Sequence, residues 1–107
     1  MSAARIRELN DAFRASFVGG RIMLTAGVDA LAVPEKAQLL EGVRGFTAFD
    51  KDNDPHHEHD FGALEVAGVR YFWKIDYYDL ALTYGSPDPA DVAVTTRVLT
   101  IMRADEY

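Results

Sequence analysis

The side chains best suited to chemistry are concentrated in residues 56–60, which are His-His-Glu-His-Asp. Imidazole and carboxylate groups are ligands of zinc, manganese and iron in proteins, and they also serve as general acids and bases. On an extended strand His57 and His59 would point to the same side, as two ligands of one metal ion must. The histidine spacing matches no strong helical zinc signature such as H-E-x-x-H, and a solvated turn explains it equally well. We favour the turn and expect no metal and no cofactor.

Three aspartates at every second position, Asp50, Asp52 and Asp54, resemble the first ligands of a calcium-binding loop. Such a loop requires glycine at its sixth position and glutamate at its twelfth. This chain has Pro55 and Phe61 at those positions. The pattern therefore does not predict an EF-hand.

An acid–base enzyme is the chemical alternative. If the chain folds back after residue 66 as a hairpin, Asp76 lies opposite His59 and orients its ring as a general base. Lys74 would then act as an electrophilic stabiliser. This alternative is a small metal-dependent or acid–base enzyme of the hydrolase type, centred on His59, Glu58 and Asp76. No serine stands in the sequence context of a nucleophile elbow, and the chain has no cysteine.

Two tight turns are predicted in the segment that must position these groups. Ala67-Gly68 is a two-residue hairpin turn that would place Val66 opposite Val69. A second turn at Tyr78-Asp79 would return the chain as a further strand over residues 80–84. Alternation from both turns predicts the same core face, which consists of Leu64, Val66, Val69, Tyr71, Trp73, Ile75, Tyr77, Leu80, Leu82 and Tyr84.

The opposite face of these strands is polar apart from three aromatic residues, Phe61, Phe72 and Tyr78. Glu65 and Arg70 would form a direct cross-strand ion pair on it. Two explanations of the aromatic residues remain open at this stage. Either the N-terminal helix covers part of this face, or the face is an interaction patch with aromatic anchors.

Helices are predicted on both sides of this sheet segment in the chain. Apolar residues recur at helical spacing over residues 3–18, and the Gly19-Gly20 pair ends that stripe. Residues 21–26 are expected to form a strand, and a second helix follows from Pro34 to about Phe46. A third helix is predicted after Asp88 and Pro89, because Val94, Val98, Ile101 and Met102 share one helical face.

These elements predict one α+β domain over residues 1–107 with the order α-β-α-β-β-β-α. We expect a sheet of about four strands, mainly antiparallel, with helices packed mainly on one face. The net charge of −6, without a cluster of Lys and Arg, predicts no direct binding to nucleic acid and none to a membrane. The N-terminal residues lack the apolar stretch of a secretory signal, and a cytoplasmic location is expected.

Four segments carry a resemblance to a known family. They are RELND at Arg7–Asp11, GGRIMLT at Gly19–Thr25, NDPHHEHDFG at Asn53–Gly62 and FWKIDYYD at Phe72–Asp79. In these the chain resembles an uncharacterised family of small alphaproteobacterial proteins, a domain of unknown function that often occurs on plasmids and other mobile elements. The resemblance implies no known activity. Its setting suggests a role in transfer or in countering host defences.

Our leading hypothesis is a non-enzymatic, acidic intracellular protein that binds a macromolecular partner through residues 50–60 and the adjoining sheet face. A protein partner is expected, and the resemblance extends the hypothesis to an inhibitor of a host-defence or DNA-processing complex, of the anti-CRISPR or anti-restriction type. The expected binding residues are Asp52, Asp54, Glu58, Asp60, Phe61, Phe72, Tyr78 and Asp79. If the protein is an enzyme, the expected catalytic residues are His59, Asp76 and Lys74.

Overall fold

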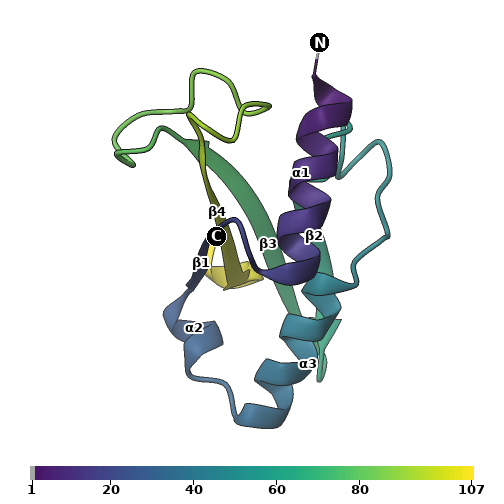
Figure 1. The fold of residues 1–107 in the computed structure, drawn as a ribbon. Coiled ribbons are helices and arrows are strands. Elements are labelled where there is room, and N and C mark those ends of the chain that lie inside the picture. Colours follow the sequence, from purple (N-terminus) through teal and green to yellow (C-terminus); the bar gives the residue numbers. More distant parts are fainter. Residues whose placement is uncertain (1) are drawn as a thin grey trace.

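A four-stranded mixed sheet carries three α-helices on one of its faces in the computed structural model, which describes residues 2–107 (Figure 1). This architecture confirms the predicted α+β class. The elements in chain order are α1 (Ala3–Ser16), β1 (Gly20–Leu24), α2 (Ala26–Asp29), α3 (Val33–Arg44), β2 (Phe61–Val66), β3 (Val69–Tyr78), β4 (Thr96–Arg103) and the 3-10 helix η1 (Ala104–Glu106).

The strand order across the sheet is β1-β4-β3-β2. The β2–β3 hairpin has the predicted register, with Val66 opposite Val69 and Gly62 opposite Trp73. Its two turn residues, Ala67 and Gly68, both have positive φ angles, of 52° and 78°. Positive φ at both central positions is typical of the type I′ turn, whose twist matches that of the strands it joins.

The hydrophobic core lies between the helices and the sheet. The predicted alternation is confirmed along β3, because Tyr71, Trp73 and Ile75 are all buried. The helices cover these residues with apolar side chains, and β4 adds two more from beside them. The buried cluster outside β2 and β3 comprises Phe13, Val28, Leu39, Val43, Phe46, Leu99 and Ile101.

The predicted second hairpin is wrong. Residues 80–84 form no strand, and Leu80, Leu82 and Tyr84 are exposed instead of lying in the core. The sheet edge that they were expected to occupy belongs to β4, which pairs antiparallel with β3 from Tyr71 to Tyr78. Since one edge of a strand accepts only one partner, the 79–95 segment becomes a long connection.

The predicted C-terminal helix is also wrong, because Thr96–Arg103 is the central strand β4. It pairs with β3 on one side and, in parallel, with β1 on the other. Leu99 and Ile101 are fully buried and alternate with threonine and valine, a composition typical of strands. The spacing of the apolar residues in this segment is compatible with a helix and with a strand. Hydrogen bonding to β1 and β3 makes it a strand. With two antiparallel pairs and one parallel pair, the sheet is mainly antiparallel, as predicted.

The N-terminal half follows the predictions more closely. Helix α1 ends with Phe17 in the left-handed conformation (φ 59°), just before the Gly19-Gly20 pair that was predicted to end it. Strand β1 and helix α3 occupy the predicted segments, and the short helix α2 between them was not predicted. No helix within residues 2–107 is long and apolar enough to cross a membrane.

Gly62 offers a test of the hairpin packing. A Cβ atom at this position would lie 2.7 Å from Trp73 Cε2 and 2.8 Å from Phe46 Cζ, which is closer than van der Waals contact allows. Because the core has little room to adjust, Gly62→Ala is expected to lower the free energy of unfolding by about 1–3 kcal/mol in urea denaturation. Gly45→Ala is the control: its Cβ would have only an ordinary contact at 3.5 Å, and a change within about 0.5 kcal/mol is expected.

Candidate functional site

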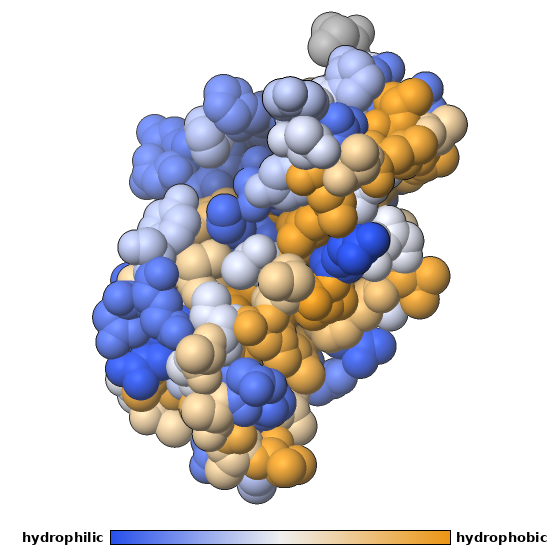
Figure 2. Space-filling view, turned by 90° about the vertical axis from the view of Figure 1, so that its left-hand side faces the viewer, coloured by the Kyte–Doolittle hydropathy of each residue, from blue (hydrophilic) through white to orange (hydrophobic). Residues whose placement is uncertain are grey.

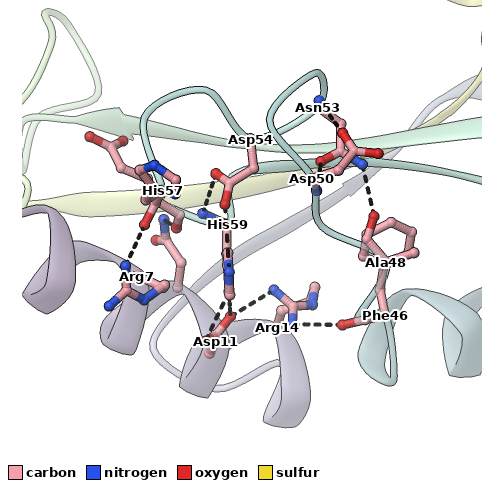
Figure 3. Close-up of polar contacts among 12 residues, drawn as sticks. Arg7, Asp11, Arg14, Phe46, Ala48, Asp50, Asn53, Asp54, His57 and His59 are labelled. Carbon is pink, nitrogen blue, oxygen red and sulfur yellow. Dashed lines mark hydrogen bonds and ion pairs between the residues drawn. The ribbon is translucent and has the colours of Figure 1, made fainter.

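His59, the centre of the predicted catalytic site, lies between two carboxylates on the helix-covered side of the sheet (Figure 3). Its Nδ1 atom is 2.8 Å from Asp11 of α1, and its Nε2 atom is 3.5 Å from Asp54. The ring also stacks on Phe49, with centroids 3.7 Å apart and an interplanar angle of 2°. A left-handed backbone at His59 (φ 53°) accompanies this placement just before β2 begins.

The expected pairing of His59 with Asp76 is wrong. Asp76 instead forms an ion pair with Lys74 at 2.8 Å, and both side chains project from β3 on the face away from Trp73. The prediction assumed that strand alternation continues back to residue 59, whereas β2 begins at Phe61. The structure therefore does not bring His59, Lys74 and Asp76 together in one cleft.

Arg14 completes the surroundings of His59. Arg14 is buried, with 5% of the residue exposed. Its guanidinium lies 3.2 Å from the Asp11 carboxylate and donates a hydrogen bond to the Phe46 carbonyl. It also lies over the rings of Trp73 and Phe49, at 4.9 and 5.2 Å from their centroids. Burial lowers the pKa of Arg14 and the Asp11 carboxylate opposes that shift, so the arginine stays charged.

Asn10 organises a second group of polar side chains, one helical position from Asp11. Its fully buried carboxamide donates to the Glu58 carbonyl at 2.9 Å and to the Tyr77 hydroxyl at 2.8 Å. Its oxygen accepts from Arg97 Nε at 2.8 Å. The Tyr77 hydroxyl donates in turn to the Glu58 carboxylate at 2.8 Å. Burial raises the pKa of Tyr77 above its ordinary value of 10.0, which keeps this hydroxyl protonated.

We name these two groups together the polar layer. It joins α1, the loop before β2, β3 and β4, and it consists of Asn10, Asp11, Arg14, Asp54, Glu58, His59, Tyr77 and Arg97. Buried or half-buried polar groups that bond one another in this way hold secondary elements in a fixed arrangement. Stabilisation of the docked helix is therefore the role that the contacts of the polar layer support.

Sequence reasoning missed four members of the polar layer, Asn10, Asp11, Arg14 and Arg97. On α1 the polar residues were assigned to solvent because the apolar stripe alone was expected to face the core. Arg97 lies in the segment that was predicted to form the third helix and that forms the strand β4 instead. The only signal in the sequence was the RELND segment, whose Asn10 and Asp11 both bond the 53–60 segment.

The predicted acidic binding loop, residues 50–60, uses several of its carboxylates in hydrogen bonds within the protein. Asp54 is buried, and the Asp50 side chain accepts from the backbone nitrogens of Asp52 and Asn53. Asp52 itself is exposed, as are His56 and His57. Within residues 2–107 no group of three or more His, Cys, Asp or Glu side chains is placed to hold a metal ion.

The side chains on the other face of the sheet form what we call the open face, since α1, α2 and α3 all pack on the opposite side. Of the two explanations for its aromatic residues, cover by the N-terminal helix is therefore wrong. Phe61 and Phe72 are half-buried with ring centroids 5.3 Å apart, and Tyr107 packs on both. The open face comprises Arg21, Met23, Phe61, Ala63, Glu65, Arg70, Phe72, Lys74, Asp76, Tyr78, Thr96, Val98, Thr100 and Met102.

Tyr107 is held over the open face by its neighbour in the chain. The Glu106 carboxylate accepts from the Thr25 hydroxyl at 2.7 Å and from the Gly27 nitrogen at 2.8 Å, at the start of α2. These bonds, with one from the Arg103 backbone nitrogen, lower the pKa of Glu106. Asp79, another predicted binding residue, accepts from the Thr83 nitrogen and shapes the 79–95 segment.

Comparison with protein families gives one match. Residues 24–106 match the family described as protein of unknown function (DUF3768). The chain belongs to this family. The match includes the loop, β3 and β4 members of the polar layer, whereas α1 precedes it. Searches of the curated proteins and of the solved structures found no match.

A substitution at Tyr77 tests whether the polar layer stabilises the fold. Tyr77→Phe removes the hydroxyl that Asn10 and Glu58 both use, and it leaves their buried groups with fewer partners. We expect a decrease in the free energy of unfolding of about 1–3 kcal/mol, measured by urea denaturation. Tyr78→Phe, which changes the adjacent residue on the open face, is the matched control. Equal effects of the two substitutions would contradict a stabilising role for the polar layer.

The surroundings of Asp60 predict that the free energy of unfolding depends on pH. Burial, with repulsion from Glu58, raises the pKa of Asp60 above its ordinary value of 3.8. From pH 3.8 up to this raised pKa the folded state holds the proton more tightly than the unfolded state, so the free energy of unfolding falls as pH rises. Asp60→Asn cannot ionise, and we expect it to be more stable than the wild type at neutral pH.

Denaturation of both proteins at several pH values measures this effect. The advantage of Asp60→Asn should disappear below pH 3.8, where Asp60 is neutral in both the folded and the unfolded state. Asp52→Asn removes the same charge from an exposed position of the loop and is the control. An advantage of Asp60→Asn that does not change with pH would contradict the prediction.

Proposed function

We propose that this protein is a non-enzymatic binding protein that engages a protein partner through its open face. The observation that carries the proposal is the cluster of Phe61, Phe72 and Tyr107 on a sheet face that α1, α2 and α3 leave uncovered. Aromatic side chains at the centre of a surface supply much of the binding energy in protein interfaces. The face therefore has the composition of a docking surface.

Charged groups surround the aromatic cluster. Arg70 lies with its guanidinium 5.4 Å from the Phe72 ring centroid, and Lys74 and Asp76 form their ion pair along the same strand. The hydrogen bond that Lys74 donates to the Asp76 carboxylate is the main cause that raises the pKa of Lys74, so the lysine is charged at neutral pH. A central aromatic group with charged neighbours fits a partner that is a folded protein with a mixed surface.

The acidic loop takes a smaller part in this proposal than the sequence suggested. Asp54 and Glu58 bond groups of the protein itself and are less available to a partner. Asp52 is exposed, and Asp60 lies immediately before the first aromatic residue of the open face. The revised binding residues are Phe61, Phe72, Tyr78 and Tyr107, with Asp52 contributing charge at the margin.

The finer proposal is that the partner belongs to a host-defence or DNA-processing complex that this protein inhibits. Its support is the resemblance to a family that often occurs on plasmids and other mobile elements, together with the net charge of −6. An acidic inhibitor is attracted to the basic surfaces that nucleic-acid-binding proteins carry. No contact in the structure favours the hydrolase alternative, since His59, Glu58 and Asp76 each bond different groups.

Site-specific photo-crosslinking in cells that carry the gene tests the binding surface. A crosslinking side chain at Thr100, on the open face, should capture a partner, whereas one at Gln38, exposed on α3, should not. Phe72→Ala should reduce the Thr100 crosslink at least roughly tenfold, because it removes a central anchor. Val33→Ala removes an exposed apolar side chain on α3 and is the control. Capture from Gln38 alone, or an unchanged yield with Phe72→Ala, would contradict the proposal.

A further inference from the structure

Arg97 is a buried cation whose hydrogen-bond acceptors within residues 2–107 are both neutral. It is only 3% exposed, and none of the ion pairs within residues 2–107 includes it. Arg14, the other buried arginine, is paired with Asp11. Burying a charge is unfavourable unless an opposite charge or several hydrogen bonds compensate it. The contrast identifies Arg97 as a group whose electrostatic needs are incompletely met by the chain.

The hydrogen bonds of Arg97 leave part of its guanidinium available. Nε donates to the Asn10 carboxamide oxygen and Nη2 to the Pro89 carbonyl, both of which are neutral acceptors. The guanidinium also makes a cation–π contact with the Tyr77 ring, with its carbon 5.3 Å from the ring centroid. A guanidinium has five N–H groups, so these bonds leave donors on Nη1 and Nη2 for a further acceptor.

Arg97 lines a groove of about 160 Å³ between α1 and the end of the 79–95 segment. Apart from Arg97, the residues that line the groove are mainly apolar. The full lining consists of Leu9, Ala12, Phe13, Val18, Gly19, Val92, Thr95 and Arg97. Figure 2 shows the side of the molecule with β1 and the 79–95 segment, where hydrophobic residues gather beside a hydrophilic region at the left of the view. Val18 and Val92, which both line the groove, are exposed hydrophobic residues.

We propose that this groove binds a small carboxylate with a compact apolar body, whose carboxylate pairs with Arg97. The planar guanidinium fork matches a carboxylate in geometry as well as in charge. The volume sets the size of the apolar part, since a cavity of about 150 Å³ holds one benzene molecule. Burial lowers the pKa of Arg97, and an anion in the groove would offset this cost. The groove lies on the helix-covered side, so the inference is independent of partner binding at the open face.

Titration of the isotope-labelled protein with benzoate, followed by backbone amide NMR shifts, tests the proposal. We expect saturable shifts at Val18, Gly19, Thr95 and Arg97 with a Kd in the millimolar range. Benzamide has the same shape without the charge, and acetate has the charge without the apolar body. Each should bind at least roughly tenfold more weakly, since each lacks half of the matched features.

A groove-filling variant provides the matched control without disturbing the bonds of Arg97 to Asn10. Ala12→Leu places a larger side chain in the groove, and it should weaken benzoate binding at least roughly fivefold. Ala15→Leu makes the same change on the same helix outside the groove and should leave binding unchanged. Absent or scattered shifts, equal binding of benzamide, or benzoate binding unaffected by Ala12→Leu would each overturn the proposal.

The same chemistry is present in a free small acid and in the C-terminal residue of a peptide. The tripeptide Gly-Gly-Phe and its C-terminal amide therefore form a second arm of the titration. Tighter binding of the free-carboxylate peptide than of benzoate, lost in the amide, supports the site and assigns its ligand to a chain end. Groove shifts with benzoate but none with the peptide support the site and assign its ligand to a free acid.

Discussion

The carboxamide of Asn10 is the contact on which the arrangement of the chain depends. It is fully buried in the middle of α1 and bonds three parts of the chain at once: the Glu58 backbone, the Tyr77 hydroxyl and the Arg97 guanidinium. A buried amide that loses such partners costs free energy, because no water replaces them. The next residue, Asp11, adds the contact with His59. Neighbouring residues of one helix therefore fix the position of the loop, β3 and β4 relative to α1.

This constraint divides the polar residues of the chain by role. The histidine and carboxylates that first suggested chemistry are used within the protein, where His59 bonds Asp11 and Asp54 and Glu58 bonds Tyr77. The groups that remain available to other molecules lie elsewhere. They are the aromatic residues of the open face, which we assign to a protein partner, and Arg97 in its groove, which we assign to a carboxylate. The 79–95 segment forms a wall of that groove because β4 excludes it from the sheet.

Local signals in the sequence predicted the local parts of the fold. The Ala67-Gly68 turn fixed a register that the structure confirms, and the apolar stripe of residues 3–18 predicted α1. Long-range pairing could not be obtained in the same way. Val94, Val98, Ile101 and Met102 suit a helix by spacing, and only the position between β1 and β3 makes this segment a strand. The site was mispredicted for a related reason: the partner of His59 is on α1, 48 residues away, and amphipathicity alone assigned that polar residue to solvent.

Hydrogen exchange on the Asn10→Asp variant tests most directly whether the polar layer holds α1 on the sheet. The substitution keeps the shape of the side chain but replaces its N–H donors with a carboxylate oxygen that faces the Glu58 carbonyl. If Asn10 has the role described, the amides of α1 and of residues 57–60 lose protection together, while the β2–β3 hairpin keeps more of its own. Wild-type protection of α1 in this variant, or a loss confined to residues next to position 10, would contradict the account.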